Sequence, residues 1–278
     1  MTARNPYATL SEYKSFKVGR GQTATTDATD DVVIDGFLEA ASRYIDDKTA
    51  RWFYPRIETR YYSTPESGNE LLFDADLLAI TTLLNGDATS IASTEYNLLP
   101  KNDTPKYGLK IKGSSSVVWE ADSNSNTDYV IALTGIFGFH NHYVDGWKVG
   151  STLAEDLDVS ELGFDMASGA LFSAGQIIKV DNEICLASSV ASNTVTVIER
   201  AANGSTAATH SSGATVHYWQ PMETARNAVL ETAVNAYRRR AGQSQGGTET
   251  ITGAGVVITP RDIPAMAEEF IRSYRRLV

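Results

Sequence analysis

The sequence contains a single cysteine, eight prolines and no hydrophobic run long enough for a membrane span. One cysteine, Cys185, excludes an internal disulfide framework. The longest apolar runs fall well short of the ~20 residues that cross a bilayer, so no membrane contact is expected. The first ten residues also lack the basic-then-apolar layout of a secretory signal. With 42% hydrophobic and 21% charged residues over 278 positions, the composition predicts a folded, soluble protein made inside the cell.

Positive charge is scarce in the middle of the chain. Residues 61–220 contain 7 basic and 19 acidic side chains, a balance of 7 − 19 = −12. Residues 1–60 contain 9 of each, and residues 221–278 contain 8 basic and 6 acidic side chains. Nucleic-acid affinity comes mainly from Lys and Arg at phosphates, so the middle of the chain is not expected to grip DNA. A surface past which DNA slides without sticking remains compatible with this charge.

Helical periodicity occurs near both ends of the chain. It predicts a long helix over residues 31–53, closed by Pro55, and a second over residues 222–240 between Pro221 and Gly242. The apolar stripe of the first helix consists of Ile34, Leu38, Ala41, Ile45 and Trp52. Residues 10–18 predict a shorter helix. These segments indicate a small helical bundle.

The region between the helices has strand periodicity. Strands are expected within residues 56–64, 71–84, 94–100 and 107–112, with a turn at Asn85-Gly86. Residues 140–165 are acidic and less regular. Residues 170–219 again alternate, with turns at Asp181-Asn182 and Ser192-Asn193, which predicts a small antiparallel module. The fold class is therefore α+β with a large antiparallel β insertion.

The last 37 residues form a distinct segment. Residues 242–255 include five glycines and predict a flexible linker. A short apolar run and an amphipathic helix that starts near Pro264 follow. Such a segment needs an apolar partner surface, which is either the body of the same chain or another protein. The candidate docking residues are Ile251, Val256, Val257, Ile258, Ile263, Met266, Phe270, Tyr274, Arg272, Arg275 and Arg276.

No catalytic or metal-binding constellation has adequate spacing, so no enzyme activity, metal or cofactor is expected. His140 and His142 form an H-x-H pair on a possible strand, but only Asp145 lies close enough in sequence to complete a site. Cys185 lies in an apolar strand without a neighbouring base, which favours a buried structural thiol. The sequon Asn203-Gly204-Ser205 is interpreted as a turn.

The order of these elements resembles a known family. A short helix precedes DDVVIDGFLEAASRYIDDKTARWFYP, followed by TRYYSTP, a strand–NGD–strand unit, YNLLPKNDTPKYGLKIK and the helix ETARNAVLETAVNAYRRRA. Over most of residues 8–241 the chain resembles the head–tail connector adaptor proteins of long-tailed bacteriophages and related gene-transfer particles. The segment that runs from GQIIKVDNEICLASSV to ATVHYW is similar to a β module that recurs in phage virion proteins.

The resemblance implies a domain organisation. Residues 1–55 and 220–241 form the helical adaptor body, and residues 56–219 form an inserted β-rich region with the β module at about 163–219. Residues 242–278 form a linker and an extended C-terminal arm that docks on the portal. The simplest adaptors are helical and near 100 residues, so the role of the insertion stays open: it widens the ring, binds the tail or decorates the connector.

The resemblance also implies a structural virion protein located in the head–tail connector and assembled in the host cytoplasm. Such proteins form a ring, commonly of twelve copies, beneath the portal. They extend the DNA channel and offer a platform to a stopper or tail-completion protein. Double-stranded DNA is then only non-specific passing cargo. Two alternatives stay open: a tail-completion or neck protein, and a carbohydrate-binding or hydrolytic β module that uses some of the four Trp and thirteen Tyr side chains for stacking.

Overall fold

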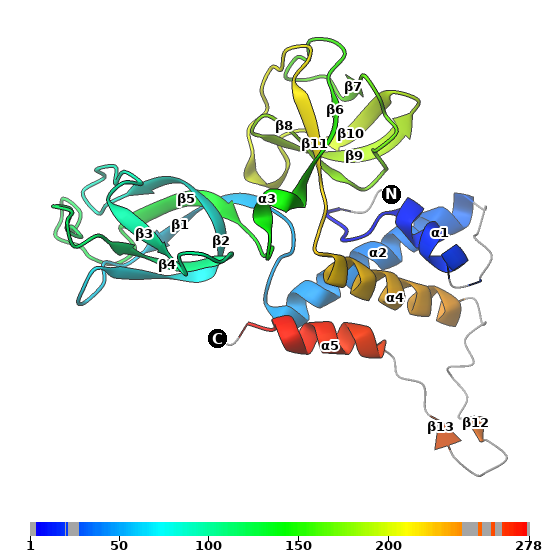
Figure 1. Cartoon of the computed structure of the whole chain (residues 1–278), viewed down its shortest axis with the longest axis horizontal. Coiled ribbons are helices and arrows are strands. Elements are labelled where there is room, and N and C mark those ends of the chain that lie inside the picture. The colour runs from blue at the N-terminus through cyan, green and yellow to red at the C-terminus, as the bar shows by residue number, and fades with distance from the viewer. Residues whose placement is uncertain are drawn as a thin grey trace. The chain divides into compact units, whose positions relative to one another are not determined.

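The computed structural model describes residues 4–19, 21, 28–240, 250–251, 257–258 and 263–276. Within these residues the fold is α+β, with five α-helices and two large antiparallel sheets (Figure 1). The chain divides into two compact units. The helix-containing unit comprises Met1–Ala50, Trp147–Ala202 and Thr206–Val278, and the five-stranded unit comprises Arg51–Gly146 and Asn203–Ser205.

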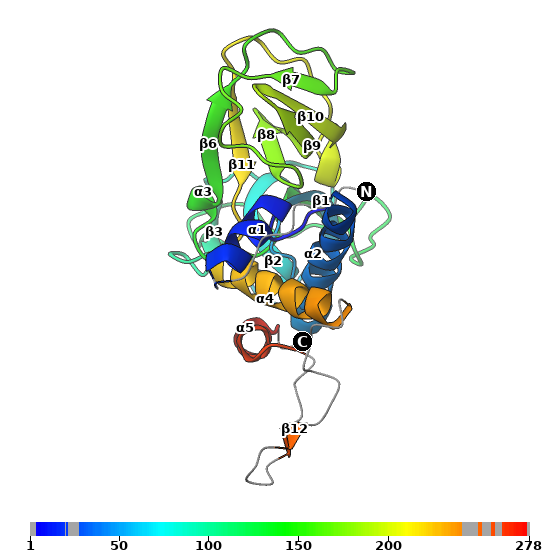
Figure 2. The ribbon, with the colours of Figure 1, turned by 90° about the vertical axis from the view of Figure 1, so that its right-hand side faces the viewer.

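The helices of the first unit come from both ends of the chain. They are α1 (Leu10–Gly19), α2 (Ala28–Thr49), α4 (Glu223–Arg240) and α5 (Ala265–Tyr274). Helix α4 packs on α1, α2 and α5, and α2 also contacts α1 and α5 (Figure 2). The predicted apolar stripe of α2 is confirmed at four positions that are buried: Ile34, Leu38, Ala41 and Ile45. Burial of one face per helix holds this layer together.

The boundaries of the two long helices differ from the sequence prediction, and α2 already begins at Ala28, before Asp31. Helix α2 ends at Thr49 rather than Phe53, because Ala50 adopts a positive φ of 54° that stops the helical path. Trp52 therefore lies beyond the helix and belongs to the five-stranded unit. Helix α4 begins at Glu223, so Pro221 precedes its first turn, and Gly242 lies outside the described residues.

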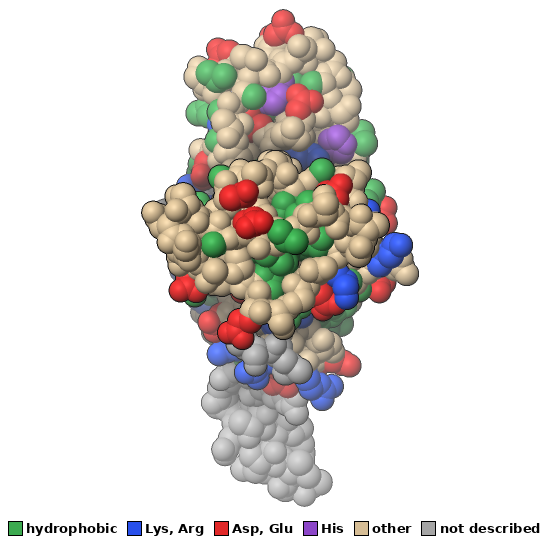
Figure 3. Space-filling view, turned by 90° about the vertical axis from the view of Figure 1, so that its left-hand side faces the viewer, with side chains coloured by type: hydrophobic (Ala, Val, Ile, Leu, Met, Phe, Trp, Pro, Cys, Tyr) green, Lys and Arg blue, Asp and Glu red, His purple; other side chains and the backbone are tan. Residues whose placement is uncertain are grey.

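The five-stranded unit has the strand order β1-β5-β2-β4-β3. Its elements are β1 (Arg56–Tyr62), β2 (Glu70–Leu84), β3 (Tyr96–Leu99), β4 (Lys106–Ile111), β5 (Ile131–Phe137) and the short helix α3 (Tyr143–Gly146). Alternate residues of β5 enter the core, where Ile131, Leu133 and Phe137 are buried. Figure 3 shows a face of this unit, on which hydrophobic side chains lie at the surface among acidic ones.

The second sheet belongs to the helix-containing unit, and we call residues 147–219 the six-stranded module. Its strand order is β6-β11-β8-β9-β10-β7. The strands are β6 (Trp147–Thr152), β7 (Gly163–Asp165), β8 (Ile177–Val180), β9 (Glu183–Ala191), β10 (Thr194–Glu199) and β11 (Thr215–Trp219), with a 3-10 turn, η1, at Ala202–Gly204. The predicted insertion over residues 56–219 thus contains two separate sheets, each with its own core.

Turn residues fix the register of the module as the sequence predicts. Asp181-Asn182 joins β8 to β9 and Ser192-Asn193 joins β9 to β10, each as a two-residue loop whose first residue has a positive φ. The turn at Asn85-Gly86 is also present. There the chain returns only as an isolated bridge between Leu84 and Ser90, so the loop is longer than a two-residue hairpin.

Two strands lie where the sequence indicated irregular structure. Within residues 140–165 the structure contains β6 and β7, which form the two edges of the module. Edge strands with only part of one face buried lack a strong hydrophobic alternation, as the half-buried residues of β6 show. No helix in the described part of the chain is long and apolar enough to cross a membrane.

Candidate functional site

The predicted docking arm divides into two parts in the structure. The short strands β12 (Thr250–Ile251) and β13 (Val257–Ile258) pair antiparallel with each other, and α5 packs on α4 and α2 of the same chain. Val256 lies outside the described residues. For the helical part, therefore, the same chain covers the apolar stripe, which is one of the two alternatives that the sequence left open.

Two side chains anchor α5 on its own chain. Ala267 and Phe270 are buried, and the Phe270 ring lies against that of Tyr274 with a centroid distance of 4.7 Å. The N–H of Arg276 donates to the carbonyl of Thr49 at the end of α2, at 2.8 Å. The body of its own chain thus removes the Phe270 ring from water, and Phe270 stays a docking residue only as a prediction. Met266, by contrast, is 48% exposed.

Grooves flank α5 on both sides. The groove on the α4 side has a volume of about 310 Å³ and is mainly apolar, with Met266 and Phe270 among its lining. The groove on the α2 side is larger, about 650 Å³. It is lined by Tyr44, Lys48, Ile263, Glu268, Ile271, Arg272, Ser273 and Arg275. Besides the buried Phe270, five of the eleven predicted docking residues line these grooves: Ile263, Met266, Arg272, Tyr274 and Arg275.

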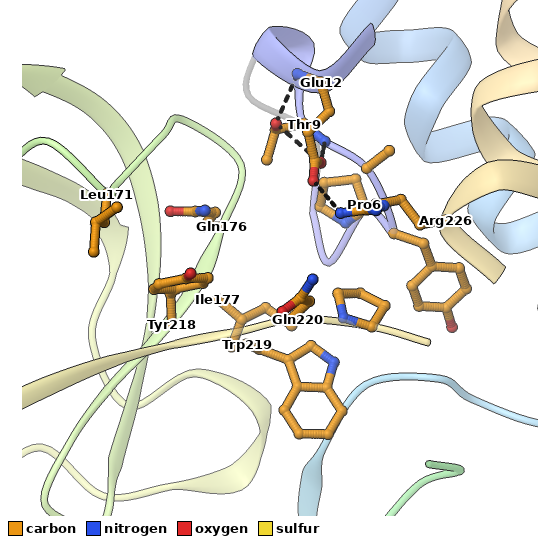
Figure 4. A pocket seen from close by; sticks show the side chains of 13 residues that line it. Pro6, Thr9, Glu12, Leu171, Gln176, Ile177, Tyr218, Trp219, Gln220 and Arg226 are labelled. Atoms are coloured by element: carbon orange, nitrogen blue, oxygen red, sulfur yellow. Dashed lines mark hydrogen bonds and ion pairs between the residues drawn. The ribbon is translucent and has the colours of Figure 1, made fainter. Parts of the chain in front are cut away.

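A smaller cavity of about 180 Å³ lies between the N-terminal segment, β11 and the start of α4 (Figure 4). Thr9 and Glu12 form a capping box at the start of α1, in which each side chain accepts from the other's backbone N–H. Arg226 of α4 also donates to Glu12, at 3.1 Å. These bonds join α1 to α4 and satisfy the polar groups along one wall of the cavity. Thr9, Glu12 and Arg226 therefore do not offer a free reactive group there.

The six-stranded module contains a buried ion network that sequence reasoning missed. The Glu183 carboxylate is fully buried and accepts from Nε and Nη2 of Arg200 at 2.6 and 2.8 Å. It also pairs with Nε2 of His210 at 3.0 Å, while Nδ1 of His210 lies 2.8 Å from Asp181. The backbone N–H groups of Ala201 and Ala208 complete the ring of donors.

Electrostatics stabilise the ionised form of Glu183. Burial alone raises its pKa, but hydrogen bonds from Arg200, His210 and two backbone N–H groups outweigh burial and lower it to about 2. Arg200 also donates through Nη1 to the carbonyls of Asp158 and Glu161, both at 2.8 Å. The network therefore holds the connection between β6 and β7 against the module. Arg200 and His210 lie 17 and 27 residues from Glu183 in sequence, so no local motif signals the network.

The weak chemical candidates of the sequence are not brought together. His140 and His142 lie after β5 rather than on a strand, and Nδ1 of buried His140 accepts from the N–H of His142 at 3.0 Å. Among the described residues, no group of three or more His, Cys, Asp or Glu side chains is placed to hold a metal ion. Cys185 is buried as expected, and burial raises the pKa of its thiol.

Comparisons with known proteins identify no family. No family model matches the sequence, and no curated protein matches it. Among solved structures, the Gp54 tailspike of Acinetobacter baumannii bacteriophage AP22, in complex with A. baumannii capsular saccharide, aligns at 18% identity with a TM-score of 0.23. The alignment covers 27% of this chain and 15% of the tailspike. A likeness this partial carries no conclusion about the fold or function of the chain.

Proposed function

We propose that this chain is a structural virion protein that forms a ring between the portal and the stopper or tail, and that the ring extends the DNA channel. The proposal starts from the resemblance to head–tail connector adaptors in the order of the sequence elements. It assigns the chain to the virion and gives it no catalytic role. Its partners are the portal, a stopper or tail-completion protein, and further copies of itself.

One structural observation carries the proposal. The helices α1, α2, α4 and α5, which come from both ends of the chain, pack on one another, and the strands of both large sheets lie between α2 and α4 in sequence. A two-stranded hairpin, β12–β13, lies between α4 and the terminal helix. This arrangement supports the proposal of an adaptor body with a β insertion and a C-terminal docking element.

The charge of the chain supports a role beside DNA that does not involve tight binding. The balance of −12 over residues 61–220 repels phosphates, so DNA passing through a channel lined by this region stays mobile. A ring of identical head-to-tail contacts also closes without a symmetric dimer interface. Neither property requires a cofactor or a metal.

Docking on the portal is proposed for the hairpin and for the part of α5 that its own chain leaves accessible. Met266 and the apolar groove on the α4 side of α5 provide such a surface. A partner that binds there adds contacts to a helix already formed, so little ordering entropy is lost for α5. The resemblance implies an extended C-terminal arm that docks on the portal. The proposal modifies this, because α5 already packs on its own chain before docking.

The test is co-expression of the chain with the portal protein of the same virion, followed by native mass spectrometry and electron microscopy. The expected result is a ring of this chain bound at one end of the portal. Deletion of residues 251–278 should leave the other helices and both sheets folded by circular dichroism but abolish portal binding. Replacement of exposed Val144 by Ser is a matched control that should retain binding.

Two results would contradict the proposal. The first is the absence of any complex between the full chain and the portal. The second is full portal binding by the deletion variant, which would show that the C-terminal arm is not required for docking. Binding on a glycan array, lost when a Trp is replaced, would instead favour the carbohydrate-binding alternative.

A further inference from the structure

The larger groove beside α5 has the character of a protein-docking surface for an acidic, partly apolar segment. Its interior is formed by the half-buried side chains of Tyr44, Ile263 and Ile271. Cations from two helices stand around it: Lys48 of α2 and Arg272 and Arg275 at the end of α5. The nearby carboxylates are Glu268, on the lining, and Asp47, whose Oδ2 lies 3.5 Å from Lys48 Nζ. Within a chain of net charge −10, this is a locally basic apolar groove.

A segment of matching chemistry lies elsewhere on the same chain. We call residues 155–162, with the sequence EDLDVSEL between β6 and β7, the acidic loop. It contains four carboxylates in eight residues. Two of its apolar side chains point into solvent, Val159 at 52% and Leu162 at 48% exposure. Exposed apolar side chains surrounded by charge of one sign are typical of a contact surface for a partner of opposite charge.

The acidic loop is held in a fixed conformation. Leu157 is buried and exchanges backbone hydrogen bonds with His210 at 2.8 and 2.9 Å. Arg200 binds the carbonyls of Asp158 and Glu161, and Asp158 Oδ1 accepts from the N–H groups of Ser160 and Glu161. The buried ion network thus presents Val159 and Leu162 from a preorganised loop, which reduces the entropy lost on binding.

The local field of the loop is negative. The charge of Asp165 is the main cause that raises the pKa of Glu155, with burial and Glu161 adding to it. A cationic partner relieves this repulsion. Lys48, Arg272 and Arg275 are cations of the required kind.

The groove and the loop cannot meet within one chain. In Figures 1 and 2, α5 lies at one end of the helix-containing unit and β7, which follows the acidic loop, lies at the other end. A contact between two different surfaces on separate copies is heterologous, and repetition of it builds a ring when the rotation closes.

We propose that the α2-side groove beside α5 binds the acidic loop of a second copy of this chain, and that this head-to-tail contact builds the ring. The inference rests on the proposed function for its ring and names the surfaces that form it. The groove on the α4 side of α5 then remains for the portal.

The test uses the full chain and two variants with one surface disabled in each. Lys48→Glu with Arg272→Glu reverses the groove charge, and Val159→Asp with Leu162→Asp disables the loop. Sedimentation velocity should show that the wild type self-associates, more tightly at about 50 mM than at about 500 mM salt. Each variant should associate at least about tenfold more weakly.

Arg240→Glu and Val144→Asp are the control variants, because both positions are exposed and lie outside the two surfaces. They should associate like the wild type.

A mixture of the two variants gives the sharpest readout. The intact loop of the groove variant fits the intact groove of the loop variant, so native mass spectrometry should find one-to-one heterodimers and nothing larger. Thermal melts by circular dichroism check that each variant is folded. The loop variant keeps the inference testable if charge reversal displaces α5.

Three results overturn the inference. They are a wild type that stays monomeric at every concentration and salt tested, variants that assemble like the wild type, and a groove variant whose only change is weaker binding of duplex DNA. A ring bound to the portal whose assembly is unaffected by both variants refutes this contact alone. Head-to-tail assembly in solution without any portal complex refutes the proposed function instead.

Discussion

Replacement of Glu183 by Gln removes a charge that the six-stranded module has buried completely. The carboxylate accepts six hydrogen bonds, two from Arg200, one from His210, one from the Cys185 thiol and two from backbone N–H groups. Gln retains one acceptor oxygen and directs an NH2 group toward donors. The Arg200 guanidinium, only 7% exposed, is then left without its counterion.

The expected loss of stability follows from this geometry. Removal of one partner of a buried ion pair costs about 3–5 kcal/mol, because the remaining charge stays desolvated. For a unit of this size each kcal/mol lowers Tm by ~2–4 °C, so a decrease of about 10 °C is expected. The acidic loop should also loosen, since Arg200 holds the carbonyls of Asp158 and Glu161.

Urea unfolding monitored by tryptophan fluorescence measures the effect. Trp147 and Trp219 lie 5.1 Å apart, centroid to centroid, in the same module and report on its packing. The matched control is Glu70→Gln, which breaks a half-exposed pair with Lys110 and should cost at most about 1 kcal/mol. Equal shifts of the unfolding midpoint in the two variants would refute the reasoning.

The pH dependence gives a second readout of the same group. The folded pKa of Glu183, about 2, lies below the ordinary value of 4.5. Its contribution to stability is therefore complete above pH 4.5 and is lost as the pH falls from 4.5 toward 2. Glu183→Gln should lack this part of the acid destabilisation, and an unchanged acid limb in the variant would contradict the assignment.

Three further predictions concern other parts of the chain. Burial, followed among the raising causes by the charge of Asp31, raises the pKa of Asp35 to about 6, so the stability of the protein decreases as the pH rises from about 4 to 6. Asp35→Asn should flatten this slope and, after allowance for solvent screening, add on the order of 1 kcal/mol to the free energy of unfolding at pH 7. Chemical denaturation at several pH values measures both effects. Phe270→Ala should release α5 without unfolding the unit, so limited proteolysis should remove the C-terminal helix at least about tenfold faster while the melting of the sheets is unchanged. Equal proteolysis of wild type and variant would contradict the role of Phe270 in holding α5 on its own chain. Lys106→Met should destabilise the five-stranded unit by about 2–3 kcal/mol, because Nζ of Lys106 donates to three backbone carbonyls at 2.6–3.1 Å that Met cannot satisfy; Lys101→Met is the control, and equal thermal stability of the two variants would contradict the role.

Local chemistry in the sequence was sufficient for the helices and the tight turns. The stripe from Ile34 to Ile45 has the helical period, and a helix with that face must bury it. Asp181-Asn182 and Ser192-Asn193 permit the positive φ that two-residue hairpin loops require. Each of these signals is contained in a few neighbouring residues, and each is confirmed in the structure.

The boundaries and edges were less accessible, because they depend on what packs nearby. Helix α2 stops at Thr49, and β6 and β7 pair at the margins of the module although their sequence lacks a clear alternation. The partner of the terminal helix was equally undetermined. The stripe with Phe270 showed that α5 must cover an apolar surface, but the periodicity is the same whichever surface that is.

The candidate sites were decided by tertiary structure alone. Glu183, Arg200 and His210 are unremarkable in sequence and become an ion network only because β9, the end of β10 and the segment before β11 converge. The groove likewise requires Lys48 of α2 and Arg272 of α5, which are 224 positions apart, to stand around one cavity. Periodicity records which side of an element avoids water, whereas charge pairing and shape depend on distances between elements that only the folded chain fixes.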